Sequence, residues 1–375
     1  MKRYSSMTAV LALMLAGALA LTGCPKTTGD DDLTDLTDLT DTTDTTDITD
    51  TTDTTVDKSA LQAALTAAKA PSIYWVKTTD LAAFETALTA FETAITTAQA
   101  VYNNAAATQT EVDSAKDTLA TATATFTTQH PAATNPVTVL AAIKAAYNSG
   151  NSPGTLGTTG AGATPVTIIV SGTVSYSSDA GSSAWLYIVG TNAYPPIVLQ
   201  GAAGGGTLNA AGSSKRVLYI GGNNKVTLGA NLTLTGGTSD SSGGGVHVSG
   251  VTFTMTGGTI SGNTATDSSG GGVAVDNSGT FIMSGGTISG NTATNTGGGV
   301  FVNTGAAGFT KTGGTIYGNS GGATANTATN GNSGHNGHAV FWWKSDDRKK
   351  VDTDVTGNLS TADPTTGWTA APPTS

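Results

Sequence analysis

The amino-acid sequence predicts a mainly β protein whose largest part is a right-handed parallel β-helix of about six or seven coils. The main observation is a repeat: residues 251–263, 280–291 and 309–319 are near-copies, and equivalent residues recur every 28 positions. A fixed period of this length is typical of coils that stack along one axis. Two changes of composition before the repeats predict a small three-helix bundle and a disordered acidic tether.

Each repeat contains short segments that alternate apolar and polar residues, separated by Gly, Asn and Ser. This pattern predicts short strands joined by bends, with the strands of successive coils paired at about 4.8 Å. Parallel crossovers are overwhelmingly right-handed, which sets the expected hand. Equivalent side chains then form ladders, apolar ones inside the coil and Asn at a bend. The expected ladder residues are Phe253, Phe281 and Phe309; Ile260, Ile288 and Ile316; and Asn263, Asn291 and Asn319.

A second motif, Gly-Gly-Gly-Val, begins at Gly243, Gly270 and Gly297. Glycine allows tight corners there. Combined with the Ile-x-x-Asn of each repeat, as at Ile260 and Asn263, the motif resembles the repeats of polymorphic outer-membrane proteins. It differs from them in having Ile for Phe and Gly for Ala. The resemblance covers roughly residues 235–340 and implies a β-helix, and through the family it implies adhesion.

Residues 1–23 are expected to be a lipoprotein signal peptide. Lys2 and Arg3 precede an apolar stretch that is too short to span a membrane as a mature helix. The stretch ends in Leu-Thr-Gly-Cys24, which resembles the lipobox of bacterial lipoproteins, where the Cys becomes the lipidated first residue. Cys24 is the only cysteine, and a lone thiol would be unusual in a secreted protein. We expect a lipid anchor in the cell envelope; the alternative is an ordinary secretory signal.

Residues 24–57 form the expected lipid-anchored tether, an Asp/Thr-rich run of low complexity. The run contains 11 Asp and one Lys, so it accounts for the whole formal net charge of −10. Like charges repel and there is little apolar surface to bury, so we expect an extended, disordered segment. Weak calcium binding is the alternative, but no Gly-centred loop of the EF-hand type is present.

Residues 58–129 are rich in Ala, contain no Gly and predict three helices. Apolar residues recur at helical spacing in the second helix, and Thr108 with Glu111 predicts a capping box at the start of the third. The pattern resembles FIVAR modules, three-helix units of bacterial surface proteins, some of which bind glycans. Tyr74 and Trp75 are expected in a loop, where they close the core of the bundle.

The remaining boundaries follow from the strand pattern. Residues 130–164 are expected to be a linker and a short helix that covers the first coil, because an open β-helix exposes strand edges. Residues 165–345 are the expected β-helix, and 346–375 the C-terminal cap and tail. The aromatic side chains of residues 341–343 are expected to cover the last coil, and the tail after Asp363 to be loose.

Parallel β-helices include polysaccharide lyases and hydrolases, so catalysis has to be considered. Hydrolysis of glycosides needs two carboxylates in one cleft, but no Glu follows Glu111. Asp240 and Asp267 fall in equivalent bends, where capping of the bend is the favoured role. His335 and His338 offer only two ligands to a metal, and we expect a structural role. We predict no catalytic residue, no metal and no cofactor.

The outward positions of the strands complete the survey. His247, Ala274 and Phe301 lie between paired valines and predict a chemically mixed face. Thr252 and Thr254 begin a Thr row like those of ice-binding β-helices, but the next coil interrupts it. Nothing predicts nucleic-acid binding, because there is no basic patch.

The sequence therefore favours a surface lipoprotein that displays its β-helix as a binding, adhesive or structural module. The expected partners are the membrane, through the N-terminal lipid, and a glycan or cell-surface protein. The competing hypothesis is a carbohydrate-active enzyme of the pectate-lyase-like β-helix type, with its site in the irregular coils between residues 165 and 234.

Overall fold

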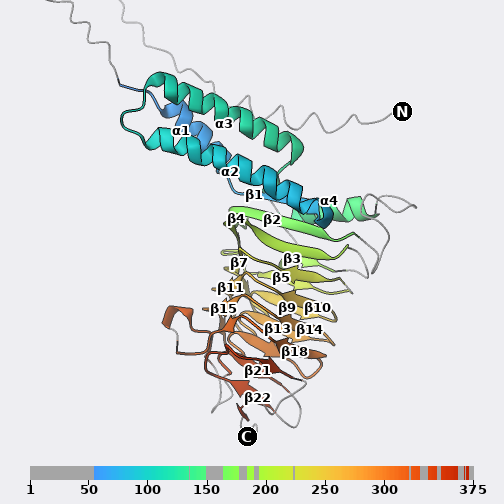
Figure 1. The fold of residues 1–375 in the computed structure, drawn as a ribbon. Coiled ribbons are helices and arrows are strands. Elements are labelled where there is room, and N and C mark those ends of the chain that lie inside the picture. Colours follow the sequence, from blue (N-terminus) through green and yellow to red (C-terminus); the bar gives the residue numbers. More distant parts are fainter. Residues whose placement is uncertain are drawn as a thin grey trace, which may run out of the picture. The chain divides into compact units, whose positions relative to one another are not determined.

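A computed structural model of the chain shows a mainly β protein: a β-solenoid of about five turns with a few helices before it (Figure 1). Cys24, the tether up to residue 54 and His335 lie outside the residues that the structure describes. The described residues are 55–134, 136–148, 164–176, 184–189, 194–222, 224–320, 322–329, 337–343, 348–361, 367 and 369–370.

The helices precede the solenoid in the chain. They are α1 (Ser59–Ala68), α2 (Leu81–Asn103), α3 (Gln109–Gln129) and α4 (Pro136–Asn148), with 3-10 turns at Thr78–Asp80 and Gly322–Thr324. Leu61 of α1, Ala98 of α2 and Leu119 of α3 share one buried cluster, so these three helices pack on one another. The predicted capping box at the start of α3 is confirmed: the Thr108 and Glu111 side chains each accept from the other's backbone N–H.

The segment between α1 and α2 is a strand rather than a loop. β1 (Ser72–Lys77) pairs antiparallel with β2 (Val166–Ser175). Because side chains alternate along a strand, β1 serves two cores. Tyr74 packs with Phe84 and Phe126 of the helices, as expected, whereas Ile73 and Trp75 lie against the solenoid core.

Three sheets build the solenoid, and their strands are in parallel register from coil to coil. The largest sheet contains β1, β2, β4 (Ile197–Asn209), β6 (Val226–Leu228), β7 (Leu232–Thr235), β10 (Thr252–Met255), β11 (Thr259–Ser261), β14 (Thr280–Met283), β15 (Thr287–Ser289), β18 (Gly308–Lys311), β19 (Thr315–Ile316) and β23 (Leu359–Ser360). The smallest contains β8 (Thr238–Ser239), β12 (Thr264–Ala265), β16 (Thr292–Ala293) and β20 (Thr327–Ala328). The third contains β3 (Ala184–Ile188), β5 (Arg216–Ile220), β9 (Val246–Ser249), β13 (Val273–Asp276), β17 (Val300–Val302), β21 (Val340–Trp342), β22 (Lys349–Val351) and β24 (Thr369–Ala370).

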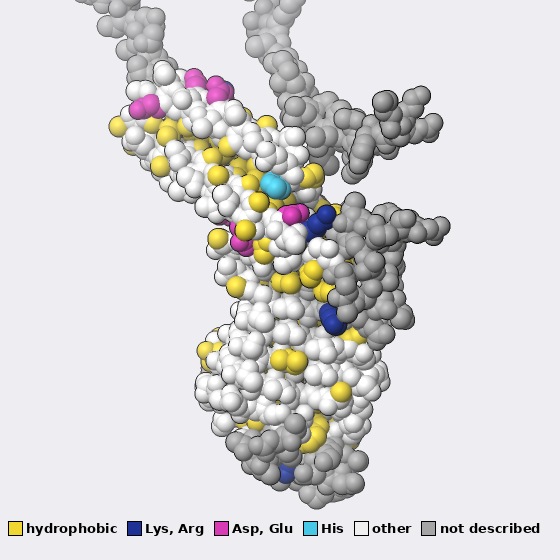
Figure 2. Space-filling model, turned by 45° about the vertical axis from the view of Figure 1, so that its right-hand side comes forward, with side chains coloured by type: hydrophobic (Ala, Val, Ile, Leu, Met, Phe, Trp, Pro, Cys, Tyr) yellow, Lys and Arg dark blue, Asp and Glu magenta, His cyan; other side chains and the backbone are white. Residues whose placement is uncertain are grey.

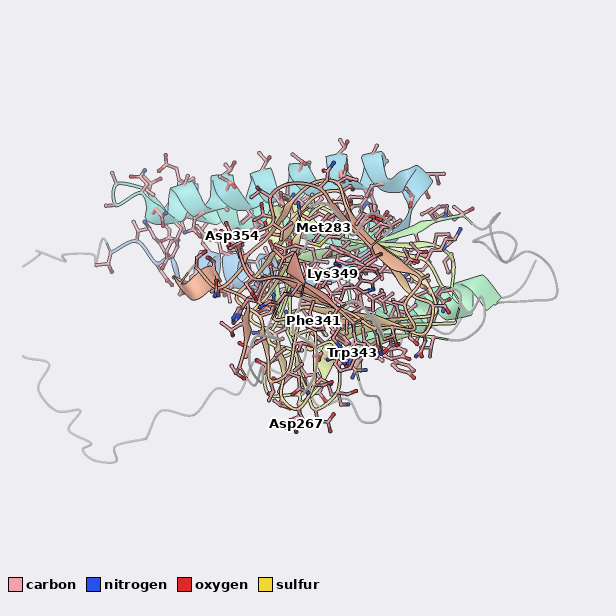
Figure 3. All side chains as sticks on the ribbon, turned by 90° about the horizontal axis from the view of Figure 1, so that it is seen from below. Asp267, Met283, Phe341, Trp343, Lys349 and Asp354 are labelled. Carbon is pink, nitrogen blue, oxygen red and sulfur yellow. The ribbon has the colours of Figure 1, made fainter. Side chains whose placement is uncertain are left out.

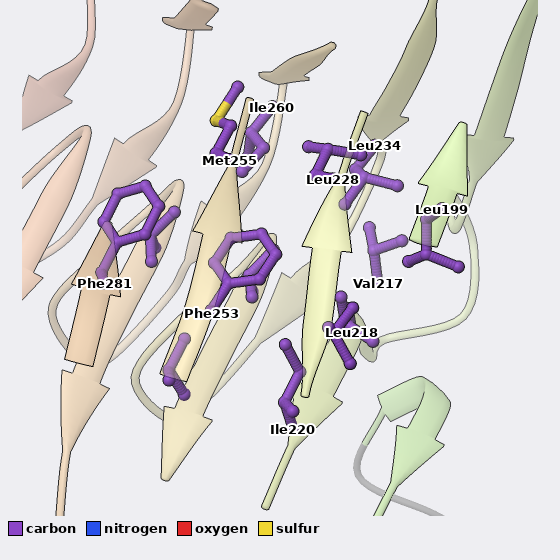
Figure 4. Close-up of a cluster of buried hydrophobic side chains, with 14 of the residues drawn as sticks. Leu199, Val217, Leu218, Ile220, Leu228, Leu234, Phe253, Met255, Ile260 and Phe281 are labelled. Atoms are coloured by element: carbon purple, nitrogen blue, oxygen red, sulfur yellow. The ribbon is translucent and has the colours of Figure 1, made fainter. Parts of the chain in front are cut away.

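The apolar ladders lie inside the coils. Phe253 pairs with Phe281, and Phe281 with Phe309, with ring centroids 5.4 Å apart at each step (Figure 4). Ile260, Ile288 and Ile316 are likewise in register. The turns are fewer than the predicted six or seven because the chain does not keep a constant period. The step from Asn291 to its ladder partner takes 35 residues, and residues from Lys349 onwards pair antiparallel instead of adding a coil.

The asparagine ladder runs through Asn263, Asn291 and Asn326, and not through Asn319 as the period predicts. The Asn263 Nδ2 donates to Asn291 Oδ1 at 3.0 Å, and the Asn291 Nδ2 donates to Asn326 Oδ1 at 2.9 Å. Asn319 is exposed, because an insertion containing the 3-10 turn Gly322–Thr324 moves the ladder position along the chain. The residues with left-handed backbone angles at these bends are Gly262 and Gly290, which precede Asn263 and Asn291, and not the asparagines themselves.

The glycine motif has a steric cause. A Cβ on Gly271 would lie 2.4 Å from the Thr292 carbonyl oxygen and 2.6 Å from that of Gly298, in the next coil. Gly298 is confined in the same way by Thr327. In the last coil His338 and Ala339 occupy the second and third places of the motif. Side chains are accommodated there because no parallel coil follows.

Both ends of the solenoid are closed by antiparallel strands. At the N-terminal end β1 covers β2, and Val139 and Ile143 of α4 join the solenoid core, as expected of a capping helix. At the other end β22 pairs with β21, and β23 with β18. The predicted aromatic cap is wrong, since Phe341 and Trp342 belong to the last parallel strand. Residues 369–370 of the predicted loose tail form β24 on β22. Figure 3 looks onto this end, with Phe341 and Lys349 near its centre.

A buried lysine ties this cap to the core. Lys311 continues the ladder of Met255 and Met283, yet only 1% of its surface is exposed. Its Nζ donates to the carbonyl oxygens of Thr356 at 3.1 Å and Gly357 at 2.8 Å. Burial lowers the pKa of Lys311. The cation therefore anchors the C-terminal segment through hydrogen bonds that satisfy it inside the protein.

Candidate functional site

The outer side of the third sheet carries a row of side chains in register, here named the aromatic row. Period-two alternation creates it, because the valine, leucine and isoleucine residues on either side of each position point into the core. The row contains, from the first coil to the last, Tyr187, Tyr219, His247, Ala274, Phe301 and Phe341.

The rings of the row stack along the solenoid. Tyr187 and Tyr219 have centroids 5.0 Å apart and an interplanar angle of 27°, and Tyr219 and His247 are also 5.0 Å apart. Phe301 and Phe341 follow at 6.3 Å. Exposure falls along the row, from 39% for Tyr187 to 0% for Phe341. The accessible part of the row is therefore its first end.

The glycine bends explain this gradient. A Cβ on Gly270 would lie 2.9 Å from that of Ala274, and one on Gly297 would lie 2.9 Å from that of Phe301. These bends thus fold against the later positions of the row. The bend before β5 is different, because Gly212 faces open space. Tyr219 consequently stays partly exposed.

A buried arginine lies beneath the tyrosines. Arg216 is 3% exposed, its guanidinium carbon is 5.6 Å from the Tyr219 ring centroid, and its Nη2 donates to Ser239 Oγ at 3.0 Å. Burial lowers the pKa of Arg216, and the nearby Tyr219, Asp240 and Asp276 act in the opposite direction. A cation held under a ring in this manner also gains a cation–π attraction.

His247 and Asp276 form a polar pair beside the row. Their Nε2 and Oδ2 atoms are 3.0 Å apart. Among the described residues, three buried polar atoms of this cluster have no hydrogen-bond partner: Arg216 Nε, His247 Nδ1 and Asp276 Oδ1. Buried polar atoms are normally hydrogen-bonded.

The sequence identified only part of this cluster. His247, Ala274 and Phe301 were expected on one outward face, and the structure places them there. Tyr187 and Tyr219 were missed because the early coils lack the 28-residue repeat. The available signal was the shared Leu-Tyr-Ile of residues 186–188 and 218–220, which places each tyrosine at the same point of its coil.

The other candidates from the sequence do not form a site. Asp240 and Asp267 are exposed at successive bends, where Asn295 Nδ2 donates to the Asp267 carbonyl oxygen at 3.2 Å. His338 Nδ1 accepts from the Ala328 N–H at 3.1 Å, which is the structural role expected of it. Within the described residues, no three His, Cys, Asp or Glu side chains are grouped to hold a metal.

A second feature is a groove of about 350 Å³ between α2 and the strands β2 and β4. Glu85 and Glu92 line it from the helix, and Gln200 Nε2 donates to Glu85 Oε1 at 3.1 Å. Leu88 and Ile169 also line the groove and are buried. Burial raises the pKa of Glu92. The sequence did not indicate this groove, because its carboxylates come from a helix and its remaining wall from the irregular coils.

The fold and its surface define a β-solenoid protein with a stack of aromatic side chains on one outer face. No family model, curated protein or solved structure that was compared with the chain matches it. Within the described part of the chain, none of the helices combines the length and the apolar character that crossing a membrane requires.

Proposed function

We propose that this protein is a bacterial surface lipoprotein that binds glycan through the exposed end of the aromatic row. The observation that carries the proposal is the stacked pair Tyr187–Tyr219 next to the buried Arg216 and the His247–Asp276 pair. Aromatic rings offer apolar area together with a polar edge, a combination enriched in binding sites.

Tyr187 has the geometry for stacking on a sugar ring. Among the described strands, the third sheet ends at β3, so no strand lies beyond Tyr187 on that side. The ring packs on Tyr219, and the residue remains 39% exposed. A pyranose would extend the stack by one place, and its hydroxyls would hydrogen-bond to the Tyr187 and Tyr219 phenols.

The remaining segments suit display at the cell surface. Cys24 would carry the lipid, and residues 24–57 would act as an extended spacer. The helices α1, α2 and α3 would form the FIVAR-like three-helix module, with the right-handed parallel β-helix beyond it. Replacing Cys24 by Ser is expected to release the protein from the membrane fraction of cells; persistent membrane attachment would contradict the anchor.

The binding test uses the full chain and a panel of immobilised neutral and acidic glycans. Tyr187→Ala and Tyr219→Ala should each weaken binding by about tenfold, as expected for a central aromatic contact. Tyr102→Ala, on α2, is the matched control and should bind as the wild type does. Absence of wild-type binding to any glycan, or equal binding by the row variants, would refute the proposal. Retention of a surface protein instead would redirect it to a protein partner.

The alternative, a carbohydrate-active enzyme, is favoured by the groove at α2. Glu85 and Glu92 lie two turns apart on α2 and both line the groove, as glycoside hydrolysis requires of a pair of carboxylates. The raised pKa of Glu92 suits a proton donor. Release of sugar products by the wild type, lost in Glu92→Gln, would support the enzyme. Binding without turnover would support the binder.

A further inference from the structure

A second outer face of the solenoid carries an unbroken column of threonine side chains beside a column of mostly small polar residues; the two columns are here named the hydroxyl face. It is the outer side of β7, β11, β15 and β19, together with the second halves of β2 and β4. One column consists of threonine in six strands that pair in succession: Thr173, Thr207, Thr233, Thr259, Thr287 and Thr315. The column two residues further on contains Ser175, Asn209, Thr235, Ser261 and Ser289.

The array faces outward except at Ser289, which is buried. Leu232 and Leu234 are buried, so the alternation of the strand directs Thr233 and Thr235 to solvent. The same pattern holds at Ile260 in the next coil. Threonine is β-branched and has few χ1 rotamers, which limits the motion of each hydroxyl and methyl group. Parallel strands hold the column at a repeat of about 4.8 Å, and alternate residues of a strand repeat at about 6.6 Å.

The hydroxyls of the threonine column are not used for folding. None of the six threonines donates a side-chain hydrogen bond to another described residue, in contrast to Thr292 and Thr327 of the smallest sheet, whose hydroxyls are 3.1 Å apart. Neither column contains a charged residue. The face therefore offers hydrogen-bonding groups in a two-dimensional lattice without a charge that would hold disordered water.

On the neighbouring face, the outer side of β10 and β14, the array of hydroxyl groups is interrupted. Thr254 is paired with Ile282, and that row does not continue as hydroxyls. The sequence drew attention to that row because it reads Thr-x-Thr-x-Thr in one coil. The pairing of strands from coil to coil shows instead that the continuous array of hydroxyl groups lies on the hydroxyl face.

We propose that the hydroxyl face binds ice. Oxygen atoms on the prism plane of ice repeat in two perpendicular directions at distances close to those of the array. The threonine hydroxyls can occupy or bind lattice water, and the methyl groups order the water between them. Many weak contacts at matched spacing act together, so the affinity rises with the number of coils in register. A flexible polysaccharide is less suited, since the threonine column contains no aromatic ring; the ring beside it, Tyr317, lies only at its last end.

The test measures how much of the full chain enters ice that grows slowly on a cooled probe in dilute protein solution. The wild type is expected to be enriched in the ice. Thr259→Lys combined with Thr287→Lys should reduce that enrichment by about tenfold or more, because two bulky hydrated cations break the plane. The matched control, Thr254→Lys with Ile282→Lys, adds the same charges to the neighbouring face and should enter ice as the wild type does.

Folding is checked by circular-dichroism melting of each variant. If the lysine pair unfolds the chain, Thr259→Ser with Thr287→Ser replaces it; removal of two methyl groups should still lower the enrichment. Exclusion of the wild type from ice, or equal loss in both lysine pairs, would overturn the proposal. Binding to chitin or cellulose particles that only the hydroxyl-face variants lose, without incorporation in ice, would also overturn it.

Discussion

The repeating inner coils and the two ends of the solenoid meet the same requirement in different ways. Every parallel strand needs a partner for its backbone on both sides. Inner coils obtain it from coils of the same kind, and this requires Gly271 and Gly298 at the points of closest approach. The ends obtain it from antiparallel strands, where His338 and Ala339 replace the glycines. The glycines therefore recur where the next coil is a similar parallel coil, and they are replaced where the next strand is antiparallel.

The largest expected effect tests the steric half of this comparison. Gly272→Val should prevent stable folding, because the new side chain would overlap the Gly299 carbonyl oxygen of the next coil. Substitutions that produce such clashes cost more than about 4 kcal/mol. Ala339→Val, at the equivalent place in the last coil, should cost about 1–3 kcal/mol. Urea unfolding of both variants makes the comparison, and equal losses would show that the coils are not stacked as described.

The asparagine ladder provides the next largest effect. Asn291→Ala removes a side chain that bonds to the coils on both sides, and leaves buried polar groups without partners. The expected loss is about 2–4 kcal/mol in the free energy of unfolding. Asn319→Ala, at an exposed position, should change it by less than about 0.5 kcal/mol. A large loss at Asn319 would mean that the ladder keeps the 28-residue period after all.

A smaller effect separates the buried lysine at the end of its ladder from the methionines before it. Because burial lowers the pKa of Lys311, the unfolded chain binds its proton more tightly than the folded chain does. The free energy of unfolding should therefore rise with pH between the lowered pKa and about 10.4; below that window the cost of burying the charge is fully present and Lys311 adds no pH dependence. Lys311→Met should lack this rise in otherwise identical denaturation series. An unchanged slope would contradict burial of the cation.

The smallest effect concerns the groove at α2. Burial raises the pKa of Glu92, so the folded chain holds that proton more tightly than the unfolded chain. As pH falls through the raised pKa, the wild type should gain stability relative to Glu92→Gln. The gain is small because the carboxyl group remains partly solvated. Thermal melting between about pH 4 and 7 measures it, and a gain of the opposite sign would exclude a desolvated carboxyl group.

The sequence predicts the fold well in the regular inner coils and poorly where the repeat is interrupted or the strands pair antiparallel. Phe253, Phe281 and Phe309 could be placed in one ladder because equal spacing in the chain means equal height in the stack. Asn326 could not, since an insertion separates it from Asn291 and only backbone pairing restores its position. The strand β1 was missed because its antiparallel partner β2 lies far along the chain, beyond all of the helices.

The candidate surfaces could also be predicted only where the sequence repeats regularly. His247 and Phe301 could be assigned to one face from period-two alternation within the regular repeats. The groove could not be foreseen, because Glu92 and Gln200 approach through tertiary packing that no local pattern encodes. The face drawn in Figure 2 has few charged side chains over the solenoid, so charge gave no help in locating a surface.

The side chains of His338 and Ala339 have a consequence for the number of coils. A structure built from copies has no inherent length, and a chain with glycine at every closest approach would accept one more coil, or the end of a second molecule. In this protein, His338 and Ala339 prevent a further parallel coil from stacking on the last one. An engineered 28-residue copy inserted between two glycine-bearing coils should lengthen the rod, whereas the same copy inserted after Trp342, beyond the last parallel strand, should find no place to stack.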